Sequence, residues 1–175
     1  MSEASDPGRV RVVPFSERHM SERYIGWLND RQVVRYSELR HRAHTAADCR
    51  GYADTMRRQG HLFWAIETGD SRHIGNLTAI IDRNNGLADL SILIGERDVW
   101  GKGYGAQAWR LACRELLGGE RLRKVRAGTM SVNAGMLAIM NKTGMQPDGV
   151  WRRHLLFEGR EVDVVFAALF RGEGA

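Results

Sequence analysis

The chain has 175 residues, 43% of them apolar and 27% charged, a mixture that favours a globular domain with a sizeable core. The formal net charge of +5 favours anionic partners such as CoA or nucleotides. No arginine-rich block or basic stretch interleaved with aromatic residues is present, which argues against nucleic acid as a partner.

The two cysteines, Cys49 and Cys113, form no Cys-x-x-Cys pair, which argues against a disulfide scaffold and suits a reducing cytoplasm. The polar start has no apolar stretch behind it, so no signal peptide is expected, and residues 1–8 are interpreted as a loose tail. The longest apolar run, Val164 to Phe170, is too short to cross a bilayer. We therefore expect no membrane partner.

In chain order, apolar alternation first predicts a strand over residues 9–14. Ser16 is a candidate N-cap for a helix that reaches about residue 29. Thr45 opens a second helix over 46–59, which Gly60 closes. Three strand-like runs follow, over 62–67, 73–81 and 88–94, with Asn84-Asn85-Gly86 as the hairpin turn between the last two.

A glycine-rich turn at 101–105 leads into a helix that ends near Gly118. A strand over 124–130, a helix over 133–142, and two final strands over 149–157 and 161–170 complete the chain. The order β-α-α-β-β-β-α-β-α-β-β places hairpins at the ends and β-α-β units in the middle. This order predicts an α/β fold with a mixed, mostly antiparallel sheet flanked by helices.

The most informative segment is Trp100-Gly101-Lys102-Gly103-Tyr104-Gly105-Ala106, where glycines separate a strand from a helix. Backbone N–H groups at a helix start lack partners and lie at the positive end of the helix dipole. Glycines let a pyrophosphate approach those groups without a Cβ in the way. The segment therefore predicts a phosphate cradle, and the alternative is a plain glycine turn before a helix.

Other ligand and catalytic patterns fit less well. Gly103, Gly105 and Ala108 match the dinucleotide fingerprint G-x-G-x-x-A, but the strand over 124–130 ends without the acid that would hold a ribose. The Walker A spacing, Gly-x-Ser-x-Gly and His-Glu-x-x-His are all absent, and nothing marks a metal site.

Three segments resemble the GNAT superfamily of N-acetyltransferases. The glycine turn is similar to motif A, usually Gln/Arg-x-x-Gly-x-Gly/Ala, with Trp100 at the Gln/Arg position. Trp27-Leu28-Asn29-Asp30, followed by Val33, Arg35 and Tyr36, resembles the first helix of the Rim-type branch, which includes ribosomal-protein N-terminal acetyltransferases. Residues 133–145 resemble motif B.

The resemblance implies one acetyltransferase domain over 9–171 whose sheet splays to admit acetyl-CoA. The glycine turn would hold the CoA pyrophosphate, the strand near 92–94 would pair with the pantetheine arm, and the helix that begins at Asn133 would flank the thiol. The implied CoA-binding residues are Ile92, Leu93, Ile94, Trp100, Gly101, Lys102, Gly103, Tyr104, Gly105, Ala106, Asn133, Met136, Met140 and Lys142.

Amide formation from a thioester needs a neutral amine, and therefore a proton acceptor. Asp89 is the preferred base because it precedes the pantetheine strand, and Glu96, His41 and His44 are alternatives. Asn133, beside the thiol end, is the second candidate catalytic residue. Many relatives supply an acid where this chain has Met136 and Met140, and neither methionine can donate a proton.

The segment 38–44, between the first two helices, would border the acceptor cleft in this fold. Its candidate substrate-binding residues are Arg40, His41, Arg42 and His44. Arginine forks suit a diphosphate, so a nucleotide-linked amino sugar is the first predicted acceptor. A protein N-terminus and a non-catalytic acyl-CoA-binding module are the alternatives. Pairing through the last hairpin would allow a homodimer.

Overall fold

Seven strands form one sheet in the order β1-β2-β3-β4-β5-β7-β6 in the computed structural model, which describes residues 9–172. The strands are β1 (Val10–Pro14), β2 (Leu62–Thr68), β3 (His73–Asp82), β4 (Leu87–Ile94), β5 (Lys124–Met130), β6 (Gln146–Phe157) and β7 (Arg160–Phe170). Only β4 and β5 run parallel, so the predicted mixed, mostly antiparallel sheet is confirmed. The expected loose tail, 1–8, lies outside the described residues.

The helices also follow the predicted order. They are α1 (Glu22–Asn29), α2 (Ala46–Arg58), α3 (Tyr104–Arg114) and α4 (Ala134–Lys142), with a π-helical turn, η4 (Glu115–Gly119), after α3 and 3-10 turns at η1 (Glu17–His19), η2 (Glu38–His41) and η3 (Arg97–Val99). Among residues 9–172, no helix is long and apolar enough to cross a membrane.

The predicted first helix is in fact two elements. Ser16 is the N-cap of η1 only, and its N–H donates to His19 Nδ1 at 3.0 Å. Ser21 then caps α1, because its hydroxyl accepts from the Tyr24 N–H. The second predicted cap is confirmed, since Thr45 and Asp48 form a reciprocal capping box at the start of α2.

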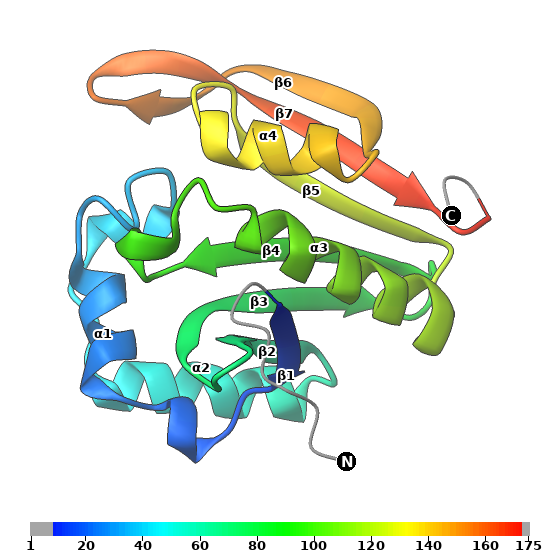
Figure 1. Ribbon diagram of the computed structural model, residues 1–175. Coiled ribbons are helices and arrows are strands. Elements are labelled where there is room, and N and C mark those ends of the chain that lie inside the picture. Colours follow the sequence, from blue (N-terminus) through cyan, green and yellow to red (C-terminus); the bar gives the residue numbers. More distant parts are fainter. Residues whose placement is uncertain (1–8, 173–175) are drawn as a thin grey trace.

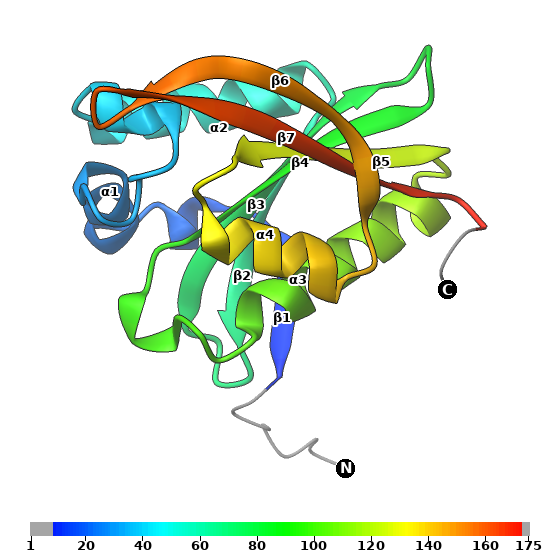
Figure 2. The ribbon, with the colours of Figure 1, turned by 90° about the horizontal axis from the view of Figure 1, so that it is seen from above.

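The helices cover both faces of the sheet (Figures 1 and 2). Helices α3 and α4 pack on one face over the main apolar cluster, in which Trp109 and Leu77 are fully buried. Helices α1 and α2 cover the other face, where Trp27 and Leu28 form a smaller cluster with Leu93 of β4 at its edge. Strand β4 therefore contributes side chains to both layers.

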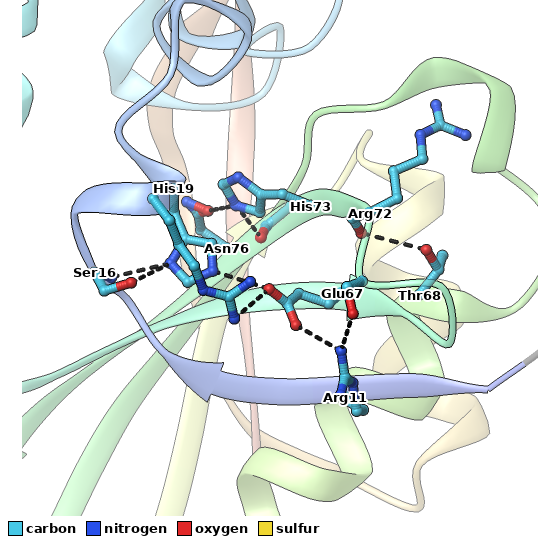
Figure 3. A network of polar contacts seen from close by, with 11 residues as sticks. Arg11, Ser16, His19, Glu67, Thr68, Arg72, His73 and Asn76 are labelled. Carbon is cyan, nitrogen blue, oxygen red and sulfur yellow. Dashed lines mark hydrogen bonds and ion pairs between the residues drawn. The ribbon is translucent and has the colours of Figure 1, made fainter. Parts of the chain in front are cut away.

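A buried carboxylate joins the elements near the N-terminus (Figure 3). Glu67 of β2 is fully buried and accepts from Arg11 at 3.0 Å, Arg18 at 2.7 Å and His19 Nε2 at 3.0 Å. Because a buried charge is costly unless it is paired, these contacts fix β1 and η1 against β2. The network positions the segment that leads into α1.

Candidate active site

A gap opens where β4 and β5 part. Within the described residues, the two strands pair only where Leu87–Asp89 runs beside Lys124–Arg126. Strand β4 then stays paired with β3 as far as Ile94, while β5 follows β7 away from it. Figure 1 shows the two strands diverging from their shared end. The splay that the GNAT resemblance implies is therefore confirmed.

Beyond Asp89, the edge of β4 that faces this gap pairs with no other strand of residues 9–172. Gly95 N–H donates to Ile74 O of the β3 side at 2.9 Å. Because backbone groups of alternate residues face opposite edges of a strand, those of Ile92 and Ile94 face the gap and those of Leu93 face β3. Trp100 Nε1 donates to Ile94 O at 2.9 Å. An extended amide-bearing chain could pair with the remaining groups of Ile92 and Ile94.

The glycine turn lies at the open end of β4. Gly101 and Gly103 adopt φ of +75° and +87°, a left-handed conformation that favours glycine. A Cβ added at either position meets no atom of the described residues within 4 Å, so the space above the turn is open. Gly103 is the N-cap of α3 and carries no capping side chain. The turn therefore fits a bound pyrophosphate.

Gly105 also has a packing role, which local sequence patterns do not predict. A Cβ at Gly105 would lie 3.0 Å from Ile139 Cδ1 and 3.7 Å from Ile94 Cγ1. Because both contacts are side chains of the core, this glycine lets α3 approach α4 and β4 closely. The absence of a Cβ at Gly105 thus serves packing.

The N-terminus of α4 is tied to β5 on the far side of the gap. Asn133 is the N-cap, and its Oδ1 accepts from the Met136 N–H at 3.2 Å while its Nδ2 donates to Thr129 Oγ1 at 3.0 Å. Met140 is 5% exposed in the main apolar cluster, and Met136 packs against that cluster. These side chains hold α4 in place and offer no acid.

Asp89, the preferred base, is paired with Arg126. Asp89 Oδ2 accepts from Arg126 Nε at 3.0 Å and lies 2.9 Å from Arg126 Nη2. Both side chains are partly exposed, at 38% and 43%, on the face that α1 and α2 cover. Asp89 therefore lies where the strands begin to part, with one carboxylate oxygen engaged.

Glu96, the second candidate base, is held by other side chains. It accepts from Trp27 Nε1 at 3.1 Å and forms an ion pair with Arg72. Trp27 packs directly on Gly95, where an added Cβ would lie 1.9 Å from the ring. This contact, which local sequence patterns do not predict, docks α1 on the end of β4.

A shallow hollow of about 330 Å³ lies between the C-terminus of α1 and η2, and we call it the basic hollow. Its lining residues are Leu28, Asn29, Arg31, Val34, Arg40, His41, Arg42 and Ala43. The structure thus brings Arg40, His41 and Arg42 together as expected. Arg31, which local sequence patterns do not single out, also lines the hollow and lies two residues after the end of α1.

Two predicted acceptor residues also support the local structure. His44 is 6% exposed, its ring Nε2 lies 2.9 Å from Leu39 O, and its backbone exchanges hydrogen bonds with the Asn29 amide. Arg40 donates to Ser37 O, Glu38 and Leu156 O. Because these bonds engage its guanidinium, Arg40 forms part of the wall of the hollow.

The tip of the β6–β7 hairpin contacts the loop between α1 and α2. Tyr36 stacks on Phe157 with ring centroids 5.2 Å apart, and Arg35 pairs with Glu158 at 2.7 Å. The Arg35 guanidinium also lies over both rings. Figure 2 shows this tip beside the loop. The contact therefore joins the hairpin tip to the loop between α1 and α2, on the face where the gap between β4 and β5 opens.

Comparisons with known proteins agree with this geometry. Residues 9–146 match the family model described as an acetyltransferase (GNAT) domain. A spermidine N-acetyltransferase from Vibrio cholerae, solved with CoA and spermine, has a TM-score of 0.84 and 15% identity, covering 94% of this chain and 96% of that one. A search of curated proteins found no match.

Two Rim-type structures are also similar. RimJ from Mycobacterium smegmatis, in complex with CoA-disulfide, has a TM-score of 0.80 and 17% identity, covering 95% of this chain and 85% of that one. The ribosomal-protein-S5-alanine acetyltransferase from Vibrio fischeri has a TM-score of 0.77 and 13% identity, covering 94% and 93%. With the family model matching most of its length, the chain belongs to the GNAT family of N-acetyltransferases, whose acetyl donor is acetyl-CoA.

Proposed function

We propose that the enzyme moves an acetyl group from acetyl-CoA directly to a primary amine of a small molecule. The observation that carries this proposal is the gap between β4 and β5 with the glycine turn at its open end. A cofactor arm between the strands would lead from that turn toward Asp89. Holding both substrates in one gap would supply much of the rate, because it replaces a bimolecular encounter.

On the donor side, backbone groups of the glycine turn would hold the pyrophosphate, and Ile92 and Ile94 would pair with the pantetheine arm. Trp100 would support the turn, since its indole N–H already binds the end of β4. Lys102 and Lys142 would add positive charge near the phosphates. Met136, which is only partly buried, would line the apolar side of the thioester end, with Met140 packed behind it in the core.

On the acceptor side, Asp89 would take a proton from the substrate ammonium, directly or through water. Arg126 would hold the carboxylate by its Oδ2, so that Oδ1 points to the incoming amine. Asn133 would act by positioning α4, because both ends of its amide are engaged. With methionines at the usual acid positions, the leaving thiolate would take its proton from water.

The acceptor we propose is an amine that also carries phosphate, with a nucleotide-linked amino sugar as the first choice. The basic hollow supports this choice, because its arginines would repel a polyamine such as the spermine bound by the similar Vibrio cholerae enzyme. The test is CoA release from acetyl-CoA with a nucleotide-linked amino sugar, the free amino sugar, spermidine and an alanine-terminated peptide. Preference for spermidine would overturn the choice.

A protein N-terminus is the second candidate acceptor, and the fold likeness to the S5-alanine acetyltransferase favours it. In the same assay, faster turnover of the peptide than of any sugar would select it. The missing acid keeps a third role open, a module that binds acyl-CoA without transferring the group. CoA binding with no release on any amine would select that role.

A further inference from the structure

We infer that the basic hollow is a phosphate-binding subsite for the acceptor, with Arg31 and Arg42 as its ligands and His41 beside them. The inference rests on the proposed function, since it names a second group on the molecule that carries the amine. It assigns acceptor specificity to residues outside the donor site and outside the Asp89–Arg126 pair.

The lining of the hollow carries more positive than negative charge. Of the described residues that line it, three are arginines and one is a histidine, and none is acidic. Glu38 pairs with Arg40 at 2.9 Å and lies 3.4 Å from His41. It is Arg31 and Arg42 that have no carboxylate partner among residues 9–172.

Two other carboxylates close in the sequence have partners of their own. Asp30 accepts from the Gln32 N–H at 2.8 Å, and Asp48 caps α2 through Thr45. Hydrogen bonds from Thr45 lower the pKa of Asp48, while Arg42 makes only a smaller contribution.

The arginines of the hollow differ in how many hydrogen bonds their guanidinium groups form. Arg40 is 16% exposed and makes the three bonds described above, so it has little capacity for a ligand. Arg31 and Arg42 are exposed, and neither side chain forms a hydrogen bond or ion pair with any residue from 9 to 172. Two such cations on one hollow repel each other, and a dianion between them would relieve that repulsion. Planar guanidinium groups suit phosphate oxygens.

His41 can add to this subsite. Its Nε2 lies 3.4 Å from Glu38 Oε2, in a pair whose side chains are both more than half exposed. Exposed pairs of this kind are weak, so a phosphate could compete with the carboxylate for the imidazole. The hollow thus offers a phosphate two fixed charges and one exchangeable donor.

The position of the hollow links it to the reaction. Leu28 forms its inner wall and also belongs to the cluster that packs on Leu93 of β4. The hollow is therefore separated from the donor strand by a single layer of side chains. An acceptor with phosphate in the hollow and amine at the gap needs a spacer between them, which a sugar ring provides.

Binding alone gives the first test. The protein is saturated with CoA, which occupies the glycine turn, and titrated with inorganic pyrophosphate in a calorimeter. We expect Arg31→Gln with Arg42→Gln to weaken pyrophosphate binding by about tenfold or more. The matched control is Arg114→Gln with Arg121→Gln, which removes the same charge from exposed residues outside the hollow. Equal loss in both double variants would overturn the inference, because only general charge would then matter.

Kinetics give the second test and separate the phosphate subsite from the proposed acetyltransferase function. For a nucleotide-linked amino sugar, the first double variant should raise the acceptor KM about tenfold or more, with the acetyl-CoA KM and the rate on the free amino sugar unchanged. If the free sugar reacts as efficiently as the nucleotide-linked one in the unmodified enzyme, the subsite is wrong and the transferase stands. If no amine reacts, the proposed function fails, while the pyrophosphate titration still judges the subsite.

Discussion

Asp89 and Arg126 form an ion pair across the last position at which β4 and β5 are joined. The pair spans 37 residues of sequence and lies at the closed end of the gap. Beyond it, β4 continues along β3 and β5 along β7. The pair can therefore fix the width of the gap at its closed end, in addition to the role as base that we propose for Asp89.

Asp89→Asn separates these two roles, because the amide oxygen can still accept from Arg126 while the side chain can no longer take a proton. We expect the rate to fall by about a hundredfold with CoA affinity unchanged, and to recover partly as pH rises and neutral amine becomes available. Steady-state kinetics from pH 6 to 9 with CoA titration will measure both. Retention of most of the activity across that range would remove Asp89 from the mechanism.

Gly103 and Gly105 should respond differently to a side chain. Gly103→Ala should abolish CoA binding, whereas Gly105→Ala should lower stability through Ile139. Gly144→Ala is the control for backbone strain, since Gly144 has φ +76° and open space in the described structure. We expect Gly103→Ala and Gly144→Ala to cost about 1–2 kcal/mol of unfolding free energy each. CoA binding that survives in Gly103→Ala would contradict the phosphate role.

Substitutions at Trp27 and Gly95 should have non-additive effects on the free energy of unfolding. A Cβ at Gly95 would overlap the Trp27 ring, so Gly95→Ala should destabilise the protein by about 1–3 kcal/mol or more. Trp27→Leu also destabilises it, but the double variant should lose less than the sum, because the smaller side chain leaves room for the methyl group. Denaturant unfolding of the four proteins will measure the coupling. Strict additivity would mean that the contact does not dock α1.

Local patterns predict much of this fold because the signals lie within single elements. Strand β5 occupies the predicted residues 124–130, and the hairpin turn at 84–86 has Gly86 at φ +62° as expected. The prediction of a single first helix is wrong because two serines each cap a separate element, η1 and α1, and Met20 breaks the helix between them. Strand β6 begins at Gln146, before its expected start, because a bulge accommodates the residues that resemble a loop.

The parts of the candidate site that lie in one short segment could be predicted from the residues themselves. The parts that join distant segments could be predicted only from the family resemblance. The expected phosphate turn follows from the alternating glycines Gly101, Gly103 and Gly105, and the splay from the family likeness. The contacts of Glu67 with His19 and of Trp27 with Glu96 join residues 48 and 69 positions apart. No periodicity encodes such pairs. For the same reason, Arg31 was missed and His44, which turns inward, was expected in the acceptor site.

Acid should destabilise the protein through His73. Burial lowers the pKa of this imidazole below its ordinary value of 6.5, and its ring contacts His19 and Trp27. As pH falls below about 6.5, the unfolded chain binds the proton first, so stability is lost until the folded-state pKa is passed. His73→Gln should therefore flatten the fall in unfolding free energy as the pH drops below about 6.5. An unchanged slope would assign the acid sensitivity to another group.

The hairpin tip should depend on its aromatic pair more than on its ion pair. Arg35 and Glu158 are 48% and 65% exposed, and such pairs contribute about 0–1 kcal/mol. The stacked rings of Tyr36 and Phe157 also bury apolar area, so they should contribute more. We expect Phe157→Ala to speed amide exchange over residues 156–159 by about tenfold or more, and Glu158→Gln to change it little. Hydrogen exchange read by mass spectrometry will compare the two variants. If the tip borders the acceptor path, Phe157→Ala should also raise the acceptor KM without changing the acetyl-CoA KM. Equal exchange in both variants would contradict the larger contribution expected from the aromatic pair.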